Sequence, residues 1–167
     1  MMRAGSILIF SLFFCVNQVV AQQEEDDEPV YVIDSVLSSQ GAMSKISPDQ
    51  IGMMTIAKGS KAVEKYGPQA ANGVIYIETK PFARKRVSTL LRSASKEYDS
   101  IYRKYGSDST FFFLVNTQPV NRNNEGILLA LDARNFVSLK VIYARELEDK
   151  YKVDGHPVGV VITSSGD

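Results

Sequence analysis

The sequence has 167 residues, of which 19 are basic and 19 are acidic, and its only cysteine is Cys15. The balanced charge gives no support for nucleic-acid binding. A lone cysteine excludes an internal disulfide and any metal site built from several thiolates, and we expect no metal or cofactor.

The first 21 residues are typical of a secretory signal peptide. Arg3 supplies a positive start, an apolar run follows, and Val19-Val20-Ala21 ends in small residues suited to signal peptidase. The apolar run is too short to span a membrane, and no later run reaches that length. We therefore expect an exported chain of 146 residues with no cysteine and no transmembrane span.

The first half of this chain predicts alternating strands and short helices. Residues 22–28 are polar and acidic, which indicates a flexible leader. The pattern beyond Pro29 predicts a strand at 30–34, a short helix opened by Ser47-Pro48-Asp49, a strand at 53–58, a helix at 60–66 ended by Gly67, and a strand from 74.

The middle of the chain predicts a basic linker followed by one long amphipathic helix, together spanning 81–106. KPFARKR (80–86) is the densest basic run. After it, apolar residues recur at helical spacing from Val87 to Tyr105, and Gly106 ends the pattern.

The second half, 107–167, repeats the spacing of the first half, 29–80. FFFLVNT (111–117) matches VYVIDS, and residues 136–151 can be laid on 51–66 without a gap. Gly159 then falls near Gly73 after a one-residue shift. The order of elements favours an α/β or α+β fold with two β-α-β-α-β halves joined by the long helix, together forming one compact domain.

The first half resembles the plug domain of TonB-dependent outer-membrane receptors, especially the nutrient-uptake type of Bacteroidetes. Four blocks in the same order carry the resemblance, namely 29–34 (PVYVID), 46–51 (ISPDQI), 56–62 (IAKGSKA) and 66–80, with Tyr66-Gly67, Ala70-Ala71-Asn72-Gly73-Val74-Ile75 and Thr79-Lys80. The resemblance covers about a third of the chain.

The sequence departs from this family in two ways. Ser35 stands where the family has glycine, and Pro68-Gln69 replaces a small-basic pair. The 87 residues after Lys80 contain the expected long helix and the second plug-like half, so we do not expect them to supply a receptor barrel. The resemblance therefore implies a plug-like module without its barrel, located in the periplasm or at the outer membrane.

The segment Tyr66, Gly67, Ala70, Ala71, Asn72 and Gly73 is the clearest family motif. Glycine ends helices and tolerates positive φ, and Asn-Gly forms turns without any ligand. We interpret these residues as a structural turn that leads from a helix into a strand.

Two other residues are weaker candidates for chemistry. His156 is the only histidine, and as a catalytic base it needs a nucleophile that the sequence does not indicate. Ser60, in KGSK, fits neither a nucleophile elbow nor a phosphate-binding loop, and an N-cap explains it. We therefore predict no catalytic site.

Two surfaces are candidates for contact with other molecules. The basic residues Lys80, Arg84, Lys85 and Arg86 form a possible contact with anionic surfaces. The final strand, 157–164, would be able to pair with a partner strand if it lay at a sheet edge.

These features predict a non-enzymatic exported binding or scaffold module that acts by protein–protein contact with an envelope protein, such as a barrel receptor or a surface complex. Two alternatives stay open: a small exported hydrolase, or a regulatory subunit of one, that uses His156, and a carrier of a peptide or small ligand.

Overall fold

The computed structural model describes residues 28–166. The expected signal peptide and nearly all of the acidic leader lie outside this range, so both stay predictions. The elements are β1 (Val30–Ile33), β2 (Val36–Ser38), α1 (Gln40–Met43), η1 (Pro48–Gln50), β3 (Ile51–Ala57), α2 (Ser60–Tyr66), η2 (Pro68–Ala70), β4 (Val74–Thr79), α3 (Lys80–Ala94), α4 (Lys96–Tyr105), β5 (Phe112–Val115), β6 (Gln118–Pro119), α5 (Gly126–Leu129), β7 (Phe136–Tyr143), α6 (Ala144–Tyr151) and β8 (Val158–Ser164).

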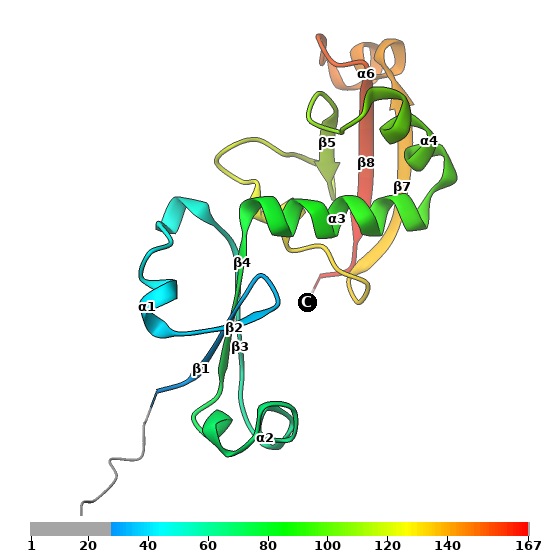
Figure 1. Cartoon of the computed structure of the whole chain (residues 1–167). Coiled ribbons are helices and arrows are strands. Elements are labelled where there is room, and N and C mark those ends of the chain that lie inside the picture. The colour runs from blue at the N-terminus through cyan, green and yellow to red at the C-terminus, as the bar shows by residue number, and fades with distance from the viewer. Residues whose placement is uncertain (1–27, 167) are drawn as a thin grey trace, which may run out of the picture.

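The strands form two sheets with the same topology. Sheet A has the order β2-β1-β4-β3, and sheet B has the order β6-β5-β8-β7. In each sheet the two central strands run parallel, and the outer strands pair with them antiparallel. Figure 1 shows the two sheets in separate parts of the molecule, with β4 leading directly into α3. The fold is α+β, as expected.

Each sheet begins with a tight hairpin that the sequence pattern did not reveal. Asp34 and Ser35 have φ of 48° and 68°, and Asn116 and Thr117 have φ of 48° and 72°. Positive φ at both central residues twists the turn in the sense that the strands require. The usual sequence signal is Asn-Gly or Asp-Gly, and neither turn has that glycine. The short strands β2 and β6 were therefore missed.

The side chains at these turns tie the hairpin to the end of the neighbouring strand. The Asp34 carboxylate accepts hydrogen bonds from the backbone N–H (2.7 Å) and the hydroxyl (2.8 Å) of Thr79. In sheet B, the Asn116 side chain accepts from the backbone N–H of Ser164 (2.9 Å) and donates to its hydroxyl (2.8 Å). Both sheets thus have a turn side chain hydrogen-bonded to the last residues of the neighbouring strand, although the residue types differ.

The register of the two sheets corrects one detail of the sequence overlay. Ile51 pairs with Thr79 and Phe136 pairs with Ser164, and each antiparallel pair is irregular after its first residue. The residue numbers differ by 85 on both strands of the pair. Val74 therefore corresponds to Gly159, and the one-residue shift that we introduced near Gly73 was wrong.

At one equivalent pair of positions, the large and the small side chain are exchanged between the two sheets. Ala57 pairs with Val74 in sheet A, and Ile142 pairs with Gly159 in sheet B. A Cβ atom at Gly159 would lie 2.7 Å from Ile142 Cγ1 and 2.9 Å from Leu147 Cδ1. Sheet A thus puts the large side chain on the central strand, whereas sheet B puts it on the edge strand and the helix.

The expected single long helix is two helices, and the expected basic linker is helical. Pro81 occupies the first turn of α3, whose N-terminus is capped by Thr79. Ser95 leaves the helical conformation (φ −140°, ψ 117°), and its hydroxyl accepts a hydrogen bond from Tyr98 N–H. A serine cap therefore ends one helix and starts the next, as capping residues do. Gly106 ends α4 with φ 74°, as predicted.

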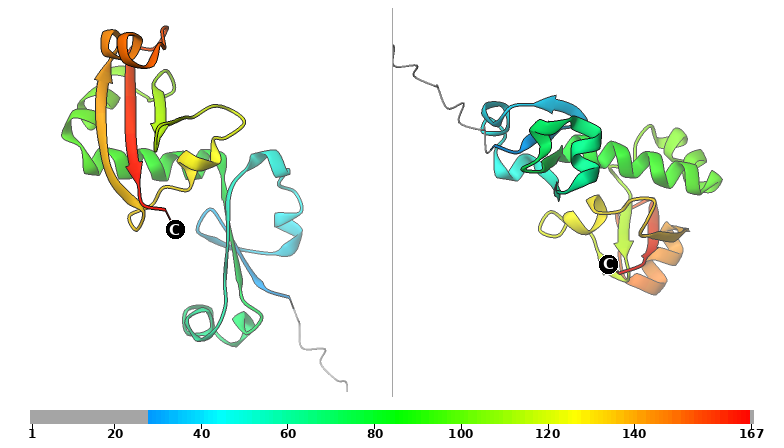
Figure 2. Two further views of the ribbon diagram at one scale, coloured as in Figure 1. Left: turned by 180° about the vertical axis from the view of Figure 1, so that it is seen from behind. Right: turned by 90° about the horizontal axis from the view of Figure 1, so that it is seen from below.

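Helices α3, α4 and α5 cover one face of sheet B and form the larger core. Figure 1 shows α3 running across the strands of sheet B, and Figure 2 shows α3 and α4 to one side of them. The buried residues of this core are Val87, Leu91, Tyr98, Ile101, Phe111, Phe113, Val115, Leu128, Leu131, Val141, Val158, Val160 and Ile162. Sheet A has a smaller cluster, Val32, Ala62, Ala70 and Val74, beneath α2 and η2.

Sheet A meets the helices that cover sheet B at the start of α3. A Cβ at Gly52 of β3 would lie 3.0 Å from Lys80 Cα, 3.1 Å from Ala83 and 3.2 Å from Leu129. Glycine lets the backbone of β3 approach α3 and α5 closely at this point. The N-terminal part of β3 is therefore covered, while its C-terminal part extends beyond the helices.

Asp108 is a buried carboxylate in the larger core. It accepts hydrogen bonds from the hydroxyls of Tyr98 (2.6 Å) and Ser88 (2.8 Å), and Arg84 lies 3.7 Å away. Burial of the tyrosine and the nearby charge of Asp108 raise the pKa of Tyr98. Tyr98 therefore stays protonated in the folded protein when exposed tyrosines ionise.

This raised pKa predicts a loss of stability at alkaline pH. Above the ordinary tyrosine pKa of about 10, the unfolded chain loses the Tyr98 proton while the folded chain keeps it. The unfolded state then binds fewer protons, so the free energy of unfolding falls with rising pH, by about 1.4 kcal/mol per unit. Urea denaturation of wild type and Tyr98→Phe between pH 9 and pH 11 should show this extra slope in the wild type only. Parallel curves would contradict the assignment.

The edges of the sheets differ from one expectation. Strand β8 lies between β5 and β7, so it is an interior strand, and the edge position on which its pairing with a partner strand depended is not met. The edge strands are β2 and β3 in sheet A, and β6 and β7 in sheet B.

Candidate functional site

The family motif residues lie in the turn between α2 and β4. Tyr66 ends α2, and Gly67, with φ 85° and ψ −175°, donates its N–H to the carbonyl of Val63. This φ is positive, which glycine tolerates, and the ψ places the residue outside the left-handed helical region. Ala70 is fully buried, while Ala71 and Asn72 are exposed.

Gly73 connects this turn to the sheet. Its φ is 100°, and a Cβ there would lie 3.0 Å from the carbonyl oxygen of Ala57. Its own carbonyl accepts the N–H of Val30, which joins the turn to β1. These contacts give every glycine of the motif a backbone role.

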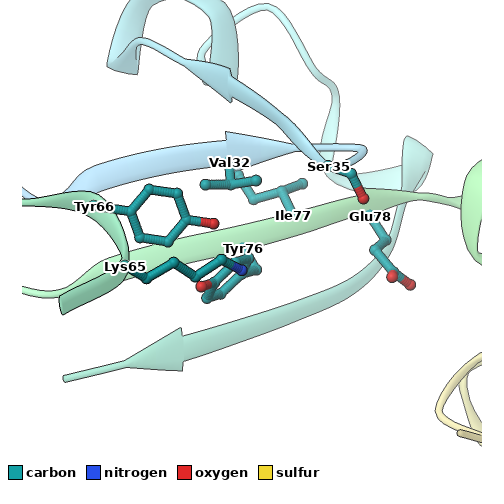
Figure 3. A pocket seen from close by; sticks show the side chains of 7 residues that line it. All are labelled: Val32, Ser35, Lys65, Tyr66, Tyr76, Ile77 and Glu78. Carbon is teal, nitrogen blue, oxygen red and sulfur yellow. The ribbon is translucent and has the colours of Figure 1, made fainter. Parts of the chain in front are cut away.

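A small cavity of about 130 Å³ lies beside this turn. Figure 3 shows Lys65, Tyr66 and Tyr76 gathered at its mouth, with Val32 and Ile77 behind them. The Lys65 ammonium lies 5.0 Å from the centroid of the Tyr66 ring and 5.6 Å from that of Tyr76. A hydrogen bond with Tyr76 lowers the pKa of Tyr66, and the same bond raises the pKa of Tyr76. Contact with Tyr66 raises the pKa of Lys65. The cavity is smaller than ordinary ligand pockets.

The basic run of α3 is largely engaged in contacts inside the protein. Lys80 lies 3.7 Å from Glu125. Arg84 lies 3.7 Å from Asp108 and stacks 4.8 Å from the centroid of the Phe113 ring. Lys85 is exposed.

Arg86 joins β4 of sheet A to the C-terminal end of α5. Its guanidinium makes a bidentate pair with Glu78 of β4, at 2.8 to 3.0 Å, and donates to the backbone carbonyls of Leu129 and Leu131. The fork of donors on arginine suits a carboxylate and two carbonyls at once. Contact with an anionic surface through Lys80, Arg84, Lys85 and Arg86 stays a prediction. Of these four residues, Lys85 is exposed and the other three are half-buried.

His156 lies at a second cavity, of about 460 Å³, which Arg84 and Arg122 also line. Its Nδ1 is 2.9 Å from the carbonyl oxygen of Thr110, and its ring centroid is 5.5 Å from that of Phe112. A carbonyl partner places the proton on Nδ1. Ser60, the other residue we considered, is the first residue of α2 and is exposed. The N-cap of α2 is Gly59, which has no capping side chain, so the N-cap predicted at Ser60 was wrong. Hydrolysis by His156 stays a prediction.

A surface that the sequence did not indicate lies on sheet A. The register aligns side chains on one face in two rows across β3, β4 and β1. We call this surface the open face, and its residues are Ile56, Ile75 and Tyr31 in one row and Met54, Ile77 and Ile33 in the other.

The β3 side of the open face is uncovered. Ile56 is 59% exposed and Met54 is 46% exposed, whereas Tyr31 and Ile77 are buried. A sheet face in contact with solvent normally carries polar side chains at such positions. The exposed apolar residues on the β3 side of the open face therefore depart from ordinary surface chemistry, as do Val36 and Leu37 of β2, which are each 64% exposed.

Within 28–166, no group of three or more His, Cys, Asp or Glu residues is arranged to hold a metal ion. Across the same residues, no helix has both the length and the apolar character to cross a membrane.

Comparison with known proteins identifies no relative of this chain. No protein-family model, no curated protein and no solved structure matches this chain.

Proposed function

We propose that this protein is an exported, non-enzymatic binding or scaffold module that acts by protein–protein contact on the periplasmic side of the outer membrane. The observation that carries the proposal is the open face, where Ile56 and Met54 remain exposed on an uncharged strand. Contiguous exposed apolar surface of this kind marks interaction sites.

Two features of the sequence support the location. Residues 1–21 are typical of a secretory signal. The four motif blocks between Pro29 and Lys80 resemble receptor plugs, which operate at the outer membrane. The resemblance concerns fold and compartment, and a plug-like fold does not by itself imply transport.

A photo-crosslinking residue placed at position 56 tests the proposal in cells that produce the protein natively. We expect a discrete adduct whose second component is an exported or envelope protein. The matched control is position 137 on β7, because Val137 is also 59% exposed. Absence of an adduct at position 56, or equal adducts at both positions, would contradict the proposal.

A further inference from the structure

We propose that the open face of sheet A is the docking site for an amphipathic α-helix of a partner protein, one that carries an acidic residue beside its apolar stripe. The inference rests on the proposed function and specifies the kind of partner. The evidence is the second copy of the same topology within this chain.

The open face has an exact counterpart on sheet B. The row Ile56, Ile75 and Tyr31 corresponds by register to Val141, Val160 and Phe113. The row Met54, Ile77 and Ile33 corresponds in the same way to Leu139, Ile162 and Val115. All six positions are apolar in both sheets, and the aromatic residue occupies the same place.

The two faces differ in what covers them. On sheet B, the apolar stripe of α3 and α4 (Val87, Leu91, Tyr98 and Ile101) packs on these rows together with α5. The two faces are alike on their inner strands, where Tyr31 and Ile77 are as buried as Phe113 and Ile162. They differ on the outer strand, where Val141 is 6% exposed and its counterpart Ile56 is 59% exposed. Sheet A has α1 in the place of α5, but α3 and α4 have no counterpart on it among the described residues. An amphipathic helix is therefore the element that would cover the exposed part of this face.

The rim of the face indicates the charge of the helix. On sheet B, the hydroxyl of Tyr143 at the end of β7 donates to Glu97 of α4 at 2.9 Å. The counterpart of Tyr143 is Lys58, which follows β3 and is exposed. A lysine at this point favours an acidic residue on the docked helix, in the place of Glu97.

A helix fits the site better than an added strand. An added strand would pair with β3, the long edge strand of sheet A, but α3 and α5 approach Gly52 in its first half. Only Met54 to Ala57 would be free to pair, which is below the commonest strand length of about five to six residues. Strand addition would also leave the apolar rows of the open face uncovered.

The probe for a binding experiment is a labelled synthetic peptide of residues 79–106, which contains α3 and α4. It is titrated with the purified chain, with Ile56→Lys, with Lys58→Glu, and with Val137→Lys as the matched control. We expect saturable binding that Ile56→Lys weakens by at least about tenfold, that Lys58→Glu also weakens, and that Val137→Lys leaves unchanged. Circular dichroism of each variant checks that the fold is retained.

Other outcomes would overturn the inference. No saturable binding up to about 1 mM, or binding that Ile56→Lys leaves unchanged, shows that the open face is not a helix site. If crosslinking at position 56 then yields a partner linked through a strand, or a second copy of this chain, the inference fails and protein–protein contact stands. If crosslinking also yields nothing, both proposals fail.

Discussion

The Gly159→Val variant is expected to lose about 3 kcal/mol of unfolding free energy, since overpacking a filled core costs 1 to 3 kcal/mol and sometimes more. The new Cβ would lie 2.7 Å from Ile142 Cγ1 and 2.9 Å from Leu147 Cδ1. Leu147 Cδ1 is the end of a side chain, but Ile142 Cγ1 is near the backbone. Ile142 and Leu147 are both almost fully buried, so neither has free space to move into. Chemical denaturation measures the loss.

The same substitution should be tolerated better when Ile142 is replaced by Ala. Sheet A already has this combination, because Ala57 pairs with the buried Val74. The double variant Ile142→Ala with Gly159→Val should therefore be more stable than the sum of the single losses predicts, by about 2 kcal/mol, as expected for residues in contact. This coupling tests whether the two sheets are equivalent in packing as well as topology.

Leu128→Ala is the control for this comparison of single and double variants. Leu128 is fully buried in α5, in the core on the opposite face of sheet B from Gly159. The unfolding free energy lost in Leu128→Ala should add to that lost in Gly159→Val within about 0.5 kcal/mol. Equal coupling for Ile142 and Leu128 would mean that the effect is not local, and the proposed equivalence would be wrong.

The Asp108→Ala variant is expected to lose about 3 kcal/mol, because buried groups left without a partner cost about 1 to 3 kcal/mol each. The substitution removes the acceptor of the Tyr98 and Ser88 hydroxyls, and both residues are buried. It also removes the carboxylate beside Arg84. The loss should appear as a lower midpoint of urea denaturation with an unchanged slope.

Asp99→Ala is the matched control on α4. Asp99 pairs with Arg92 and Arg103 at the surface, and these contacts lower its pKa. Exposed ion pairs contribute little to stability, so this variant should lose much less than Asp108→Ala. Asp108→Asn, which keeps one acceptor, should fall between them. Equal losses for Asp99→Ala and Asp108→Ala would show that Asp108 acts only through charge.

Local sequence signals predicted several elements correctly. Helix α2 runs from Ser60 to Tyr66, as its spacing and Gly67 predicted, and Ser47-Pro48 opens the short helix η1. Signals of this kind depend on a residue's own conformational preferences, so they can be read without knowing the neighbours. The ungapped overlay of 51–66 on 136–151 also agrees with the register.

Other predictions were wrong where the local sequence signal was weak or fitted more than one structure. Ser95 is a helix cap, but in the sequence it continues the amphipathic period of the flanking residues, so one helix was expected. The basic residues 80–86 were interpreted as a linker because charge is common in linkers, yet they form the first turns of α3. The position of β8 inside its sheet follows from non-local pairing, which no local pattern contains.

The candidate sites also divide into one that local sequence signals predict and one that depends on tertiary packing. The turn at 66–73 was recognised from its residues alone, whereas the open face was not recognised at all. Met54 and Ile56 alternate as any half-buried strand does, and Val141 in the second half does the same. What separates them is the presence of α3 and α4 over one face only.

The sequence by itself determined the composition limits, the turn residues, most strands and helices, and the repeated spacing of the two halves, because each depends on short-range preferences. Tertiary structure alone decided which sheet received the helix pair, which carboxylate was buried and which apolar rows stayed exposed. Those outcomes depend on β4 continuing into α3 and carrying both helices away from sheet A and over sheet B. One chain segment can cover only one of two equivalent faces, so the other face remains open to a partner.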